Sequence, residues 1–117
     1  MHFASDNSGP VHPRVMEALT RANAGHALPY GNDDLTRLAT DRVRELFEAP
    51  EAAVDLVATG TAANALALAC LSDPWDTIFC TPLAHVEEDE CNAPEFYSGG
   101  AKLTLVGTGE RMCPEAL

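Results

Sequence analysis

The sequence predicts an α/β fold built on a partial, mostly parallel sheet with flanking helices. Two helical patterns lie before residue 50, and three short apolar runs with strand character follow them, separated by helical or irregular segments. Strands that alternate with helices are typical of α/β proteins, because crossover connections place successive strands in parallel. Three short strands and two or three helices leave much of such a sheet bare. We therefore expect the chain to form the front portion of a larger domain.

Two helices are expected in the first part of the chain. The first runs from near Pro13 to Ala24, because proline fits a first helical turn and the glycine that follows tends to end a helix. The second begins at Asp33 or Asp34, whose side chains can cap a helix, and ends at Pro50. Apolar residues at helical spacing give each of them one apolar face.

Strand and turn signals dominate the remainder of the chain. The expected elements are a strand over 53–58, a helix over 62–71, a strand over 77–81, an irregular acidic segment over 87–90 and a strand over 102–106. Residues 1–52 are accordingly expected to form an N-terminal extended segment, over 3–7, and two helices. Residues 53–117 are expected to form the first βαβ part of the same incomplete domain.

Composition and charge exclude several classes of partner. Seven Lys and Arg residues against 18 Asp and Glu residues give a formal net charge of −11, which repels nucleic acids and anionic membrane surfaces. No apolar stretch is long enough to span a bilayer, and the N-terminus lacks the pattern of a secretory signal. The four cysteines show no paired spacing, so reduced thiols in a cytoplasmic protein are favoured over a zinc site.

A glycine and a threonine at a strand-to-helix junction form the strongest functional signal. Gly60 lets the backbone approach a ligand closely, and the free amides of the first helical turn beside Thr61 are typical of phosphate sites. His85 follows the next strand, and the carboxyl ends of parallel strands open on the same sheet edge. We therefore expect a phosphate site and an imidazole on one rim. The alternatives are a plain helix start with Thr61 as its cap and a histidine that only forms local hydrogen bonds.

Six segments occur in an order that resembles the amino-terminal third of the low-specificity L-threonine aldolases. They are Phe3–Asn7, Tyr30–Asp34, Thr59–Asn64, Ala84–Val86, Asp89–Glu95 and Gly100–Leu103. These aldolases are pyridoxal 5'-phosphate enzymes of the aspartate aminotransferase fold. The resemblance therefore implies the front portion of the large domain of a fold-type I pyridoxal-phosphate enzyme, and a homodimer or homotetramer for the full-length protein.

The resemblance also implies roles for individual residues. Gly60 and Thr61 match the turn that binds the cofactor phosphate, and His85 matches the histidine that stacks on the cofactor ring near the substrate hydroxyl. Ser5 matches a serine that helps to hold the substrate carboxylate. Tyr30 lies in a region that approaches the site of a neighbouring subunit in the family.

The implied reaction is the retro-aldol cleavage of L-threonine, and of L-allo-threonine, to glycine and acetaldehyde. The sequence leaves open whether His85 takes the proton of the substrate hydroxyl or only orients the cofactor ring. Lys102, at the entry to a strand, is the only lysine. The Schiff-base lysine, the pyridine-pairing aspartate and the carboxylate-binding arginines of the family correspond to positions beyond residue 117. We therefore expect the 117-residue chain alone to have no aldolase activity.

Two other functions remain open at this point. A β-eliminating lyase on the same scaffold would share the early cofactor residues and differ in its products. A small non-catalytic α/β module that binds a phosphorylated ligand or a protein partner would fold by itself and unfold cooperatively.

Overall fold

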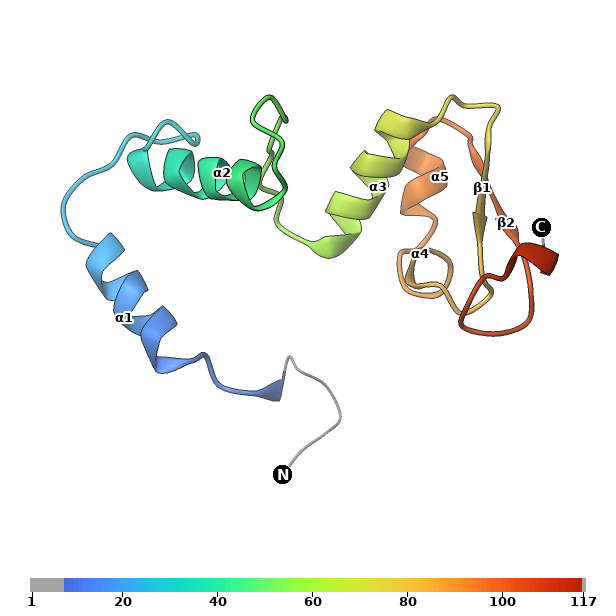
Figure 1. The fold of residues 1–117 in the computed structure, drawn as a ribbon, viewed down its shortest axis with the longest axis horizontal. Helices are drawn as coiled ribbons and strands as arrows, with labels where there is room; N and C mark the ends of the chain where they lie inside the picture. Colours follow the sequence, from blue (N-terminus) through green and yellow to red (C-terminus); the bar gives the residue numbers. More distant parts are fainter. Residues whose placement is uncertain (1–7, 117) are drawn as a thin grey trace. The chain divides into compact units, whose positions relative to one another are not determined.

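The computed structural model describes residues 8–116, which fall into two units (Figure 1). The first unit ends at Asp55 and the second begins at Leu56. The extended segment expected over 3–7 lies outside the described residues. Among residues 8–116, no helix combines the length and the apolar character needed to cross a lipid bilayer.

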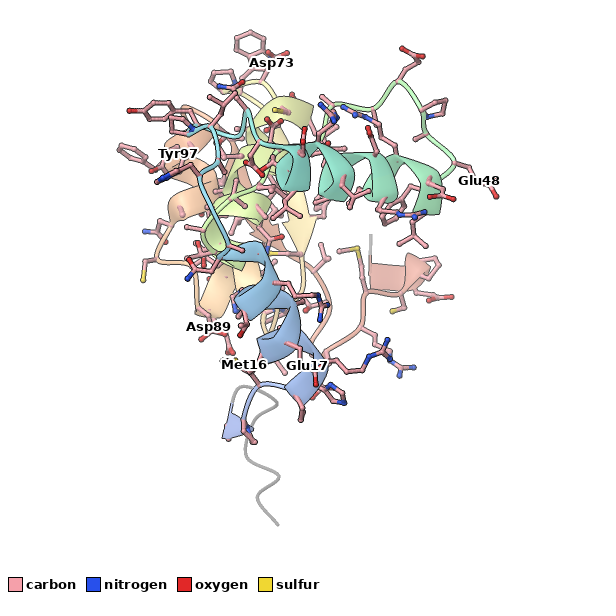
Figure 2. The ribbon with its side chains drawn as sticks, turned by 90° about the vertical axis from the view of Figure 1, so that its left-hand side faces the viewer. Met16, Glu17, Glu48, Asp73, Asp89 and Tyr97 are labelled. Carbon is pink, nitrogen blue, oxygen red and sulfur yellow. The ribbon has the colours of Figure 1, made fainter. Side chains whose placement is uncertain are left out.

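Helix α1, Pro13–Ala22, begins where the sequence predicts. His12 is its N-cap, and the imidazole Nδ1 atom accepts a hydrogen bond from the amide of Arg14 at 3.2 Å. The helix ends slightly before the predicted Ala24, because the chain turns ahead of a left-handed glycine. No residue of α1 is buried, and its apolar side chains, among them Met16, are open (Figure 2).

Helix α2, Asp34–Leu46, is fixed at its start by a strong cap. The carboxylate of Asp33 accepts hydrogen bonds from the amide of Thr36 at 2.9 Å and from its hydroxyl at 2.7 Å. These bonds hold the pKa of Asp33 below its ordinary value, and the bond from the Thr36 hydroxyl has the larger effect. The helix ends before the predicted Pro50, and Glu48 follows it in a left-handed conformation with φ 52° (Figure 2).

The strand predicted over 53–58 is not formed, so this part of the sequence analysis is wrong. These residues carry neither helix nor strand, and they have no β-partner among residues 8–116. Alternating apolar residues form a strand only where a neighbouring strand takes up their backbone hydrogen bonds. The two strands that the described residues contain pair with each other. The strand–helix–strand unit expected between residues 53 and 81 is therefore absent from the described part of the chain.

The second unit contains a two-stranded parallel sheet. Strand β1, Thr77–Cys80, pairs with strand β2, Lys102–Leu105, along the whole length of both, with Thr77 opposite Lys102. Both strands lie within the ranges that the sequence predicts. The predicted parallel arrangement of strands is therefore confirmed. The βαβ unit consists of β1, the helical segments that follow it and β2, instead of the strands expected over 53–58 and 77–81.

Helices accompany the sheet of the second unit. Helix α3, Gly60–Leu71, packs against α5, Ala93–Tyr97, and α5 contacts β2, so α5 lies between α3 and the strands (Figure 1). A single-turn helix, α4, His85–Glu88, precedes α5, and a 3₁₀ turn, η2, covers Pro114–Ala116. Helix α4 overlaps the acidic segment predicted to be irregular over 87–90, and α5 follows it. Neither helix was predicted, because helical turns this short leave no detectable period. Tyr97 lies on the outer side of α5 (Figure 2).

The core of the second unit is small. Its buried apolar residues are Ala65, Cys80, Pro94, Ala101, Leu103 and Val106. The turn before β2 requires glycine, since a Cβ atom on Gly100 (φ 133°) would lie 3.2 Å from the carbonyl oxygen of Pro74. This close approach fixes the start of β2 beside the loop that enters β1, where the amide of Lys102 donates to the carbonyl oxygen of Asp76 at 3.0 Å.

Candidate functional site

The first turn of α3 has the geometry of an anion-binding helix start. Thr59 is the N-cap, and its side-chain oxygen accepts a hydrogen bond from the amide of Ala62 at 3.1 Å. The alternative in which Thr61 caps the helix is therefore wrong. The amides of Gly60 and Thr61 precede the first intrahelical bond, so they point out of the helix end beside the positive end of its dipole. They provide donors for a negatively charged group.

Packing within the described residues does not require a glycine at position 60. A Cβ atom added to Gly60 would meet no other atom within 4 Å. The space beside the Cα atom of Gly60 is thus open, and it can admit a ligand close to the backbone.

His85 is the first residue of α4, after the turn that follows β1. Its side chain is 63% exposed, and its Nδ1 atom lies 2.8 Å from Oε1 of Glu90. The imidazole is therefore not part of the apolar core. One ring nitrogen is bound to a carboxylate, and the other, Nε2, faces away from it.

Glu90 is a residue that the sequence analysis does not select. It is 1% exposed, and the same Oε1 atom accepts a second hydrogen bond from Nδ2 of Asn64 at 2.7 Å. Its Oε2 atom is buried and has no hydrogen-bond partner among residues 8–116. The acidic run over 87–90 is typical of a solvated loop, so only the separation of five residues from His85 hinted at a contact.

Asn64, His85 and Glu90 form one hydrogen-bonded chain. Since Asn64 belongs to α3, this chain connects the open helix start to the imidazole after β1. Helix α4 and the start of α3 lie at the same end of the second unit (Figure 1). The arrangement offers backbone donors for an anion and an imidazole nitrogen that can accept a proton.

Two further residues of the predicted site belong to the N-terminal part of the sequence. Ser5 is outside the described residues. Tyr30 belongs to the first unit, where it follows Pro29 in a turn with φ 63° and is 97% exposed. A left-handed conformation is uncommon for a bulky residue, and here it presents the whole ring to solvent.

Cys80, the last residue of β1, is a core residue rather than a nucleophile. Burial raises the pKa of its thiol, and the negative charges of Glu87 and Glu95 raise it further. The thiol is thereby kept protonated, and the protonated form is a poor nucleophile. The other cysteines, Cys70, Cys91 and Cys113, are exposed and free. Across residues 8–116, no group of three or more His, Cys, Asp or Glu side chains could hold a metal ion.

Comparisons with known sequences point to one family. A family model described as Beta-eliminating lyase matches residues 2–117. A low specificity L-threonine aldolase of Pseudomonas aeruginosa is 47% identical over 106 residues, which cover 91% of this chain and 30% of that protein. A second low specificity L-threonine aldolase, from Pseudomonas sp. strain NCIMB 10558, is 43% identical over 116 residues, which cover 98% of this chain and 33% of that protein.

The fold also matches a solved structure. The threonine aldolase of Leishmania major superposes with a TM-score of 0.78 at 29% sequence identity, and the match covers 97% of this chain and 31% of that chain. The predicted fold class, part of a fold-type I enzyme, is confirmed by this match. The chain spans about a third of the length of the proteins that it matches. With a family model that matches nearly all of its residues, the chain belongs to the beta-eliminating lyase family.

Proposed function

We propose that the chain supplies the cofactor-phosphate turn and the histidine of a pyridoxal 5'-phosphate-dependent lyase that cleaves L-threonine and L-allo-threonine to glycine and acetaldehyde. The observation that carries the proposal is the hydrogen-bonded connection from α3 through Glu90 to the exposed imidazole of His85. It joins a helix start suited to an anion with a group that can accept a proton. The substrate follows from the two Pseudomonas relatives, both of which are named low specificity L-threonine aldolase.

The residues at the start of α3 fit the phosphate of this cofactor. The amides of Gly60 and Thr61 are free to donate, and the space beside Gly60 is open. The hydroxyl of Thr61 is not used as the helix cap, since Thr59 has that role. When bound, pyridoxal phosphate would supply an electron sink for the negative charge that remains when the Cα–Cβ bond of the substrate breaks.

His85 would contribute through its Nε2 atom. With Nδ1 bound to a carboxylate, the lone pair of Nε2 is available to take the proton of a substrate hydroxyl, which is the proton that must leave for retro-aldol cleavage. The flat ring can at the same time stack on the cofactor. We further propose Ser5 as a partner of the substrate carboxylate and Tyr30 as a contact to the site of a neighbouring copy in a homodimer or homotetramer.

A chimera tests the function. Residues 1–117 replace the matching segment of the Pseudomonas aeruginosa relative, which supplies the remaining two thirds of the fold. We expect the chimera to release glycine and acetaldehyde from L-threonine when loaded with pyridoxal phosphate. The 117-residue chain alone should release neither, because its single lysine, Lys102, lies in β2 and the cofactor tether of the family is expected elsewhere. A chimera that binds the cofactor and cleaves no amino acid would contradict the proposal.

A matched pair of variants tests the phosphate turn in the same chimera. Gly60→Val fills the open space at the start of α3, so we expect weaker binding of pyridoxal phosphate in a titration followed by absorbance. Gly109→Val is the control, because Gly109 also has open space around it and lies far along the chain from α3. Equal affinity in both variants would remove Gly60 from the site.

A β-eliminating lyase is the second candidate, because the family model carries that description. The two reactions differ in their products. An aldolase releases glycine and an aldehyde, whereas an eliminating lyase releases a keto acid and ammonia. Product analysis of the chimera with L-threonine therefore selects one of them.

A further inference from the structure

We propose that Glu90 is a positioning residue, whose buried carboxylate holds His85 in the tautomer with Nδ1 protonated and Nε2 free, while Asn64 fixes which atom of residue 90 faces the ring. The inference rests on the proposed function, since the imidazole concerned is the one assigned there to the substrate. It adds two residues to the site that act through His85.

The contacts of Glu90 account for its burial. At 1% exposure, a carboxylate loses its hydration, which is unfavourable unless hydrogen bonds replace it. The hydrogen bonds that replace hydration all involve Oε1, which accepts from Asn64 at 2.7 Å and lies 2.8 Å from Nδ1 of His85. The other oxygen, Oε2, has no hydrogen-bond partner among residues 8–116. The side chain is thus placed for the two contacts of Oε1 rather than for general packing.

The contact with Oε1 determines the tautomer of His85. An ionised carboxylate can only accept hydrogen bonds, so the Nδ1 atom must carry the proton that the bond needs. In the neutral ring Nε2 then has the lone pair, and the side chain that carries it is 63% exposed. Without Glu90, both tautomers would be populated and the ring would rotate.

The backbone around Glu90 is shaped for this contact. On a continuous α-helix, side chains five residues apart point about 140° apart, so His85 and Glu90 could not meet if α4 continued. Helix α4 instead ends at Glu88, and Cys91 and Asn92 both adopt left-handed conformations, with φ 51° and φ 60°. A left-handed conformation is uncommon at a cysteine, whereas asparagine adopts it more readily. Together the two residues turn the chain directly after Glu90.

Asn64 selects the atom that faces the imidazole. Its Nδ2 group donates to Oε1 of Glu90, so that position must hold an acceptor. If residue 90 is changed to glutamine, the side-chain oxygen will occupy this position. The side-chain nitrogen would place its N–H donors against the N–H donors of Asn64. Glutamine should therefore keep the tautomer of His85 as long as Asn64 is present.

The test compares Glu90→Asp with Glu90→Gln in the chimera described above. Aspartate keeps the charge and withdraws the acceptor by one methylene, which breaks the 2.8 Å contact. We expect E90D to lower kcat about 10- to 100-fold with little change in KM, as for other groups that orient an imidazole. E90Q should keep most of the kcat. Glu88→Gln, which neutralises an exposed carboxylate of α4, is the control and should leave kcat unchanged.

The tautomer is read in the cofactor-free chimera by histidine-selective ¹⁵N labelling, with the signals of His85 assigned from the His85→Phe variant. At mildly alkaline pH, where free imidazole is neutral, we expect a protonated Nδ1 and an unprotonated Nε2 in the unchanged protein and in E90Q. E90D should show mixed tautomers. This measurement needs no turnover. An inactive chimera would contradict the proposed function, but its tautomer signals would still decide the role of Glu90.

A double-mutant cycle separates positioning from a general structural role. In the His85→Phe background, E90D should cause no further loss of kcat, because the effect of Glu90 passes through the imidazole. A further loss as large as in the unchanged background would overturn the proposal, as would an unaltered tautomer in E90D or equal kcat in E90D and E90Q. If the E90D chimera does not fold, a double variant replaces it, in which Asn64→Leu is combined with E90Q. Without Asn64, the side-chain amide of the introduced glutamine is free to turn its nitrogen toward His85. The proposal then requires that His85 no longer shows the single tautomer with Nδ1 protonated.

Discussion

His85 has an exposed imidazole ring in which one of the two nitrogens is hydrogen-bonded to a carboxylate. Its side chain is 63% exposed, yet its Nδ1 atom is held 2.8 Å from a carboxylate oxygen. Exposed side chains usually sample several rotamers, and a reaction that needs one of them must first restrict the others. Here the restriction comes from Glu90, which is itself buried. The imidazole can therefore meet a ligand in an orientation that is already set.

Replacement of His85 by phenylalanine separates proton transfer from ring stacking. Phenylalanine keeps a flat ring and has no nitrogen that can accept a proton. In the chimera we expect kcat to fall about 10²- to 10⁴-fold, while the absorbance of the bound cofactor persists. His26→Phe changes an exposed histidine of the first unit and serves as the control. Undiminished turnover in the His85 variant would restrict this residue to stacking.

At the residue scale, the candidates found from sequence are those with local signals. Gly60 and Thr61 stand at a helix start, and His85 follows a strand, so each has a recognisable place in the chain. Glu90 has no such signal, because it sits in an acidic run, and its burial and its contact with Asn64 exist only in the folded chain. A left-handed conformation at a cysteine is set by tertiary contacts and has no signature in composition or periodicity.

Helix α2 depends on the ionised form of its cap. Hydrogen bonds from the hydroxyl of Thr36, and to a smaller extent from its amide, lower the pKa of Asp33 from its ordinary value of 3.8. A carboxyl with a lowered pKa in the folded state stabilises the fold above its ordinary pKa, and this contribution is lost as the pH falls through the lowered value. We expect the helical circular dichroism of the chain to decrease below about pH 4 more than in Asp33→Asn, which caps without titrating. Identical acid profiles would contradict this role, and Asp34→Asn, at an exposed position, is the control.

The elements differ in how well the sequence predicts them. The start of α2 and the position of α1 follow from caps and periodicity, which act within a few residues. Helix α3 follows from a run of small residues, and it begins at Gly60, before the predicted residue 62. The strand over 53–58 was predicted from the same kind of local pattern and does not form, because pairing depends on a neighbour elsewhere in the fold. Strands β1 and β2 were predicted correctly since each finds its partner in the other.

The described part of the molecule leaves much of its apolar surface exposed. No residue of α1 or α2 is buried. In the second unit, Leu71 is 82% exposed, Trp75 80% and Phe96 78%. A domain of marginal stability relies on burying such side chains. We expect the isolated chain to unfold over a broad temperature range, as followed by calorimetry and circular dichroism, and to bind a hydrophobic dye before heating.

The opposite result has a clear meaning. One sharp transition, with equal calorimetric and van't Hoff enthalpies, would show that the isolated chain is a self-sufficient cooperative unit. That outcome would favour the small non-catalytic module over a part of a larger enzyme.

The register of the parallel sheet has a consequence for the order in which the chain folds. Thr77 and Lys102 are neighbours in space across about 25 residues of chain, so their pairing must wait for a loop to close. A helix such as α3 involves only local contacts and can form far sooner. His85 and Glu90 both lie inside the loop. During synthesis, α3 with Asn64 would form early, whereas the contact from Asn64 to Glu90, which lie 26 residues apart, would form only after the chain between them has folded back.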